Sequence, residues 1–171
     1  MIFPISPIRT NPVFKKSIKA SAVALLAMGA AIWLRSPWGK PLRHLVGPDL
    51  TAAVEHLLAG FSYTLLAASA FYLGTMILLG LVLRLGLALD PDPEAHLPFS
   101  SIVTLACVIG FGYLVYQGIW ETRQAFVSVY GGPARGYVQH DQLFCDFAGV
   151  GLAIAWVQAI ARGGSVRRQG D

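Results

Sequence analysis

The sequence predicts an all-α integral membrane protein, a four-helix bundle with short loops. One observation is that four long stretches contain no charged residue, at 20–34, 57–83, 97–120 and 147–161. The other is composition: apolar residues make up 55% of the chain and charged residues 13%, about half the charged share of a soluble domain. Uninterrupted apolar stretches of this kind are typical of helices that cross a bilayer.

The chain of 171 residues has room for one domain, and the polar segments between the stretches are too short to form a second. We expect an extended N-terminal arm over 1–15, a transmembrane domain over 16–163 and a polar tail over 164–171. Within the domain, the spans are expected at about 16–35, 57–88, 99–122 and 141–162.

The N-terminal arm is expected to be extended because Pro4, Pro7 and Pro12 are spaced too closely for a stable helix. The first span is short, since Lys19 and Arg35 bracket its apolar residues, but long basic side chains can reach the interface from such positions. Basic residues before an apolar run also resemble a signal peptide. The run continues as far as Arg35, so we expect a retained helix.

The second span is preceded by residues 50–59, which are mildly amphipathic and carry Glu55 and His56. They form either an interfacial helix or the first turns of a long second span. Gly60 is a candidate kink between the two parts. The span is expected to stop before the prolines of the segment 90–93.

The third helix is expected to begin after Pro98 and to run at least to Trp120. Its helical spacing continues as far as Tyr130, where a Gly-Gly-Pro sequence follows. The fourth helix is expected to begin near His140 and to end at the glycines that follow Arg162.

The distribution of basic residues predicts that both termini are cytoplasmic. An even number of spans places both termini on one side, and that side carries eight of the Lys and Arg residues against five on the other. An excess of basic residues marks the cytoplasmic side of plasma or inner membranes. Because these residues flank the spans instead of forming a patch, the net charge of +4 does not indicate nucleic-acid binding.

A stripe of small residues follows one face of the fourth helix, at Gly151, Ala155, Ala159 and Gly163. Small residues at a four-residue spacing let two membrane helices approach closely. The stripe is expected to pack inside the bundle or, alternatively, against another subunit. On this basis Ala155→Leu should disturb packing, whereas leucine in place of Val157 should be tolerated.

Antiparallel spans bring polar residues to one level near the outer surface. This candidate polar cluster consists of Glu55, His56, Gln117, Glu121, His140 and Asp146. Glu121 and Asp146 are expected to approach each other, with His56 or His140 nearby, and such a group could hold a metal ion or pass protons. The alternative is that helix ends simply meet water and that Glu121 pairs with Arg123 or Arg135. Gln117 and Asp146 lie deepest and carry most of the functional interpretation.

The sequence carries no motif of strong chemical meaning. It has no phosphate-binding loop, HExxH or GxSxG, and no histidine deep in a span that could pair across helices to ligate haem. No cofactor is therefore expected, apart from a candidate metal ion at the polar cluster, and catalysis is not expected.

The function expected from these features is that of a non-catalytic subunit, structural or accessory, in a larger membrane assembly. The alternative is a small oligomeric transporter, channel or metal-handling protein that uses the polar cluster. The expected partners are the lipid bilayer and other membrane protein subunits, in a homo- or hetero-oligomer.

Overall fold

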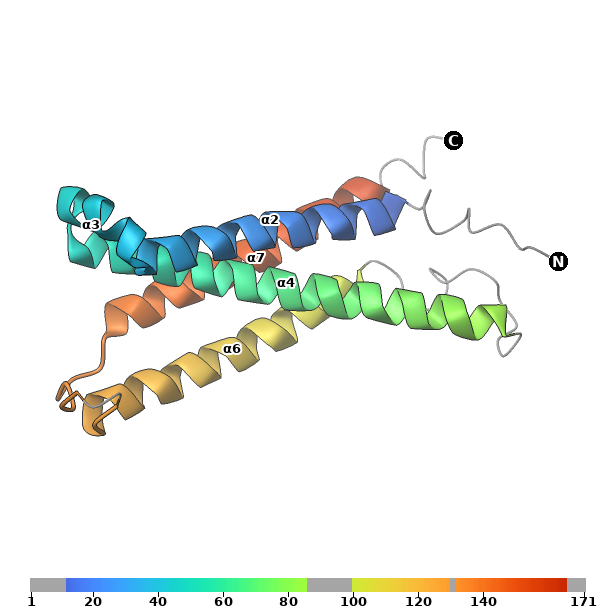
Figure 1. The fold of residues 1–171 in the computed structure, drawn as a ribbon. Coiled ribbons are helices and arrows are strands. Elements are labelled where there is room, and N and C mark those ends of the chain that lie inside the picture. Colours follow the sequence, from blue (N-terminus) through green and yellow to red (C-terminus); the bar gives the residue numbers. More distant parts are fainter. Residues whose placement is uncertain (1–11, 86–99, 130–131, 166–171) are drawn as a thin grey trace.

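The protein is an all-helical bundle of four long helices (Figure 1). The computed structural model describes residues 12–85, 100–129 and 132–165. Four of its helices are long and apolar enough to cross a membrane, which confirms the predicted fold class. They are α2 (Pro12–Arg35), α4 (Pro48–Arg84), α6 (Ser101–Phe126) and α7 (His140–Ser165), and between the first two lie the 3-10 helix η1 (Pro37–Gly39) and the short helix α3 (Lys40–Val46).

Helix α2 begins at Pro12, earlier than the expected start at residue 16. Proline is accepted in the first turn because its missing N–H would have no partner within the helix there. The rest of the expected arm, residues 1–11, lies outside the described residues. At its other end the Ser36 hydroxyl donates to the Trp33 carbonyl at 2.7 Å and accepts from the Trp38 N–H at 3.2 Å. These bonds end α2 and begin η1.

Helix α4 is continuous from Pro48 to Arg84, so residues 50–59 are the first turns of the second span and not a separate interfacial helix. The span therefore begins at Pro48 and not near 57, and it passes through Gly60 without a break. The helix that precedes it is α3, which the sequence did not predict. Gly47, with φ of 91°, ends α3 in a backbone conformation that favours glycine.

The ends of the last two helices differ from the expected ones. Helix α6 ends at Phe126 because Val127 is extended, so the continuation towards Tyr130 is wrong. Helix α7 continues to Ser165, slightly beyond the expected end at 162. The segments 86–99 and 166–171, which include most of the expected polar tail, lie outside the described residues.

Helix α4 is the centre of the bundle and packs against α2, α6 and α7. The start of α2 and the end of α7 lie together at one end of the bundle, with α3 and the α6–α7 connection at the other (Figure 1). The side chains of the buried core are mostly small: Ala20, Ala24, Leu65, Ala68, Tyr72, Ile102, Ala106, Ala153 and Val157. Large apolar side chains such as Leu26, Phe111 and Phe147 point outward, as lipid-facing residues do.

Three glycines mark the closest contacts between helices. A Cβ at Gly60 of α4 would lie 2.5 Å from the Asp146 carbonyl oxygen of α7. In return, a Cβ at Gly149 of α7 would overlap the Leu57 carbonyl oxygen of α4 and lie 2.8 Å from the Phe61 nitrogen. The two backbones therefore touch. Gly110 of α6 makes a similar contact with Val150 of α7, where a Cβ would lie 2.5 Å from Cγ1.

The small-residue stripe does not pack inside the bundle, so that interpretation is wrong. Gly151, Ala155 and Ala159 are exposed, and Gly151 has no atom of another helix near the position of a Cβ. The burial of Gly163, the fourth member of the stripe, is not among the described features. The inner face of α7 instead carries Gly149, Ala153 and Val157, which have the same four-residue spacing.

The effects on folding that were expected for Ala155→Leu and for leucine at Val157 are therefore reversed. Val157 is 1% exposed and belongs to the core, so a larger side chain there meets packed neighbours. Leucine at Ala155 extends into the surroundings of the bundle. Among the described residues Ala155 is exposed, so an effect of Ala155→Leu would point to a contact beyond them.

We predict that Gly149→Ala destabilises the bundle whereas Gly151→Ala does not. The added methyl group at 149 overlaps the α4 backbone, and only a shift of one helix can relieve this overlap, at a cost of about 1–3 kcal/mol. At 151 the methyl group meets open space, and alanine is the better helix former. The measurement is thermal unfolding of both variants in mild detergent. Equal midpoints would contradict the close contact.

Candidate functional site

Asp146 is the most deeply buried ionisable group among the described residues, with 0% exposure. It lies on α7, and both of its carboxylate oxygens have partners on other helices. Oδ2 lies 2.9 Å from Nδ1 of His56 on α4, and Oδ1 accepts from the Tyr113 hydroxyl of α6 at 2.8 Å. One carboxylate thus joins three helices through two hydrogen bonds.

Tyr113 extends this arrangement into a chain of hydrogen bonds. Its hydroxyl donates to Asp146 and accepts from Nε2 of Gln117, at 2.7 Å. A hydroxyl that donates and accepts at once is polarised, which strengthens both bonds in a medium of low dielectric constant. The Tyr63 ring of α4 lies against the Tyr113 ring, with centroids 5.1 Å apart. We call His56, Tyr113, Gln117 and Asp146 the buried polar chain.

The glycine contacts explain why these side chains meet. His56 lies one turn before Gly60 on α4, and Asp146 lies one turn before Gly149 on α7. Because the two backbones touch at these glycines, the side chains one turn away converge within hydrogen-bond distance. On α6, Tyr113 lies one turn from Gly110, where that helix meets α7.

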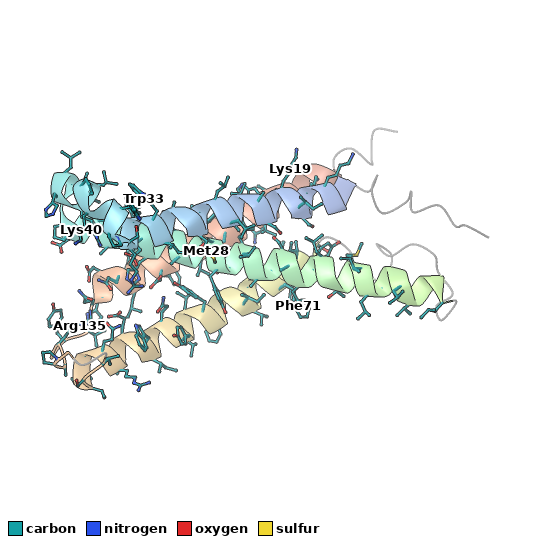
Figure 2. The ribbon with its side chains drawn as sticks, in the orientation of Figure 1. Lys19, Met28, Trp33, Lys40, Phe71 and Arg135 are labelled. Carbon is teal, nitrogen blue, oxygen red and sulfur yellow. The ribbon has the colours of Figure 1, made fainter. Side chains whose placement is uncertain are left out.

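Glu121 forms a second, separate group with the α6–α7 connection. Its side chain is 3% exposed, and Oε2 lies 2.8 Å from Nη2 of Arg135, which also donates to the Gln124 side chain. The backbone N–H groups of Arg135 and Gly136 donate to the Gln124 and Ala125 carbonyls. These bonds hold the connection against the last turns of α6, at the bundle end where Figure 2 places Arg135 and Lys40.

The structure therefore divides the predicted polar cluster. It joins Gln117 and Asp146, the two members that were expected to lie deepest, with His56, one of the two predicted histidines. Glu121 binds Arg135, one of the two alternatives left open, and in the described residues it makes no bond to Asp146. Glu55 lies 3.4 Å from Arg35, a pair whose arginine is 79% exposed and which adds little stability.

His140 is the remaining member of the predicted cluster, and the structure places it elsewhere. It lies exposed at the start of α7, outside the buried polar chain. Of the two histidines expected near Asp146, His56 is the one that binds it.

Tyr113 is the member of the site that the sequence analysis missed. A tyrosine within a long apolar run resembles a lipid-facing residue, and nothing local distinguishes it. One signal was present, because Tyr113, Gln117 and Glu121 follow each other at a four-residue spacing on one face of α6.

The chemistry available to the buried polar chain is hydrogen bonding and proton exchange. A carboxylate and an imidazole in contact can share a proton, and the tyrosine hydroxyl continues the path to Gln117. Within the described residues, no group of three or more His, Cys, Asp or Glu side chains is arranged to hold a metal ion. The candidate metal therefore has no ligand set in that part of the chain.

No protein-family model matches this chain, and neither a curated protein nor a solved structure shows significant similarity to it.

We predict that Tyr113→Phe and Asp146→Asn each destabilise the bundle and that their effects are coupled. Tyr113→Phe removes the donor to Oδ1 of Asp146, and Asp146→Asn replaces the charged acceptor of both bonds by a neutral amide, each at a cost of about 1–3 kcal/mol. The double variant should lose less than the sum of the two losses, by about 0.6–1.7 kcal/mol, the range for side-chain hydrogen bonds in membranes.

The measurement for this cycle is the free energy of unfolding in detergent. Asp141→Asn is the matched control, because Asp141 is exposed in the first turn of α7 and its change should have little effect. Strict additivity of the two losses would show that Tyr113 and Asp146 do not bind each other.

Proposed function

We propose that this protein is a non-catalytic, structural or accessory subunit of a larger membrane assembly. The observation that carries the proposal is the exposed small-residue face of α7, formed by Gly151, Ala155 and Ala159. Small residues on a membrane helix permit a second helix to approach closely. Among the described residues, no atom lies within 4 Å of a Cβ placed at Gly151. The free face is suited to a helix of another subunit.

The buried polar chain supports the same proposal. Both oxygens of Asp146 and the hydroxyl of Tyr113 are occupied by partners within the chain. Such an arrangement holds α4, α6 and α7 in a fixed register, and each of these atoms has a partner among the described residues. A rigid bundle with one free helix face fits a subunit that positions its neighbours.

We predict that Ala155→Leu separates the protein from its partner subunit while leaving the bundle folded. Leucine fills the space that a second helix would occupy, whereas in the described part of the chain Ala155 is exposed. The measurement is mass spectrometry of the proteins that co-purify in mild detergent, alongside thermal unfolding of the variant. Ala70→Leu is the matched control, since Ala70 is an exposed alanine of another helix, α4. Equal co-purification with both variants would contradict the proposal.

A small transporter or channel is the second candidate, and one observation favours it. Asp146 is completely buried, but the His56 side chain is 20% exposed, so the imidazole connects the carboxylate with the surface. An ionisable residue inside a membrane is a functional candidate by default. A pure homo-oligomer whose proton or ion flux in liposomes is lost in Asp146→Asn, and kept in Asp141→Asn, would replace the first proposal with this one.

We further propose that both termini face the cytoplasm of a plasma or inner membrane. The basic residues support this orientation, with eight on the side of the termini and five on the other. In a background without native cysteines, a cysteine introduced at Ser165 should react only from the cytoplasmic side. One introduced at Gly132 should react only from the opposite side. Reaction of both from the same side would refute the four-span topology, and reversed labelling would refute the orientation.

A further inference from the structure

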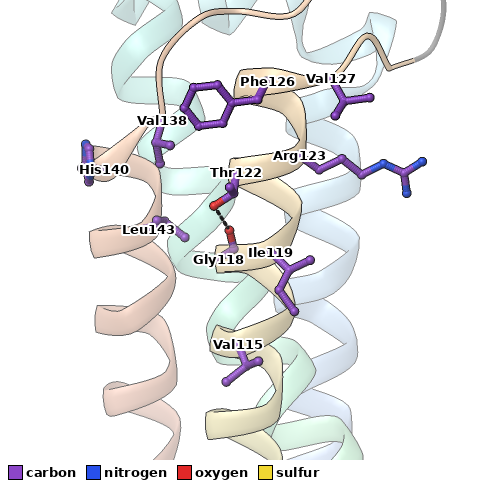
Figure 3. Close-up of a pocket in the computed structure, with 10 residues that line it drawn as sticks. All are labelled: Val115, Gly118, Ile119, Thr122, Arg123, Phe126, Val127, Val138, His140 and Leu143. Atoms are coloured by element: carbon purple, nitrogen blue, oxygen red, sulfur yellow. Dashed lines mark hydrogen bonds between the residues drawn. The ribbon is translucent and has the colours of Figure 1, made fainter.

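An open groove of about 780 Å³ lies between the last turns of α6 and the start of α7 (Figure 3). Its lining is mainly apolar, with Val115, Ile119, Phe126, Val138 and Leu143 among its residues. Among the described lining residues, Thr122 carries the only hydroxyl, which donates to the Gly118 carbonyl at 2.8 Å and is thus satisfied. The groove is separate from the buried polar chain and offers an apolar ligand a continuous surface.

The depth expected for the groove follows from the length of α6. Helix α6 has 26 residues, about 39 Å of helix, which exceeds the thickness of the hydrocarbon core of about 30 Å. When α6 is centred in the bilayer, its final turns reach the headgroup region. Val115 marks the deep end of the groove, and Phe126 and Val127 mark the end nearest the α6–α7 connection.

Arg123 supplies a positive charge at this level. Its stem lines the groove, and its guanidinium extends outward from α6 on the rim opposite His140 (Figure 3). Among the described residues the Arg123 side chain has no hydrogen bond or ion pair. The arginines nearby are occupied: Arg35 pairs with Glu55, Arg135 with Glu121, and Arg43 donates to backbone carbonyls.

We propose that this groove binds an anionic phospholipid, with an acyl chain along α6 and α7 and the phosphate at Arg123. An apolar groove with Arg123 on its rim, whose guanidinium is unpaired among the described residues, is complementary to both parts of such a molecule. Gly118 has no side chain, and among the described residues no atom lies within 4 Å of a Cβ placed there. This position therefore leaves space for the acyl chain.

The headgroup part is tested by native mass spectrometry of the full chain released from detergent. The probes are phosphatidylglycerol and phosphatidylcholine with identical acyl chains. We expect retention of phosphatidylglycerol to exceed that of phosphatidylcholine, and Arg123→Gln to reduce this preference about fivefold, the equivalent of about 1 kcal/mol for one basic residue at an anionic surface. Lys40→Gln is the control, since it removes an exposed positive charge at the same end of the bundle but outside the groove. Equal loss in both variants, or none in Arg123→Gln, would overturn the proposal.

The acyl-chain part is tested by filling the groove. Gly118→Leu should abolish retention of the lipid, whereas Gly112→Leu should not, because Gly112 is an exposed glycine of the same helix outside the groove. Thermal unfolding shows whether both variants are folded. If Gly118→Leu is not folded, Phe126→Ala, which shortens the apolar wall of the groove, tests lipid retention in its place. If Gly118→Leu instead removes a second copy of the chain or another protein while lipid retention stays unchanged, the groove is a protein contact and the proposal fails.

Discussion

The direct backbone contact between α4 and α7 is the constraint on which the rest of this structure depends. Gly60 and Gly149 let the two helices approach until backbone atoms touch, and no residue with a side chain fits at either position without a shift. Membrane helices lack a hydrophobic driving force between them, so close packing of this kind is a main source of their association. The contact also sets the distance between the polar side chains one turn away.

The buried polar chain follows from this contact and strengthens it. An unpaired carboxylate inside a membrane bundle is costly, but at Asp146 two donors from two other helices are within reach. Because each bond crosses between helices, α6 cannot rotate without breaking the bond of Tyr113 to Asp146. The same atoms thus fix the register of three helices, which fits a subunit that presents a rigid surface.

The fold could be predicted from the sequence because the thickness of a bilayer imposes a length on each uncharged stretch. The positions of His56, Gln117 and Asp146 along antiparallel spans also predicted correctly that the three residues lie at a similar depth. The side of each helix that packs against the rest of the bundle was harder to predict. In α7 the sets Gly151–Ala155–Ala159 and Gly149–Ala153–Val157 have the same spacing, and spacing alone does not show which set turns inward. Tyr113 was missed for a related reason, since its role depends on the side of α6 that meets α7.

The distance between the Asp146 carboxylate and the His56 ring in a lipid bilayer tests the central claim most directly. Solid-state NMR of the full chain, with ¹³C in the aspartate carboxyl groups and ¹⁵N in the histidine rings, measures it through their dipolar coupling. The account predicts a measurable carbon–nitrogen coupling, because Oδ2 lies 2.9 Å from Nδ1 and the labelled carboxyl carbon is one bond further. This coupling should disappear in His56→Gln. A spectrum in which no aspartate carboxyl couples to a histidine ring would contradict it.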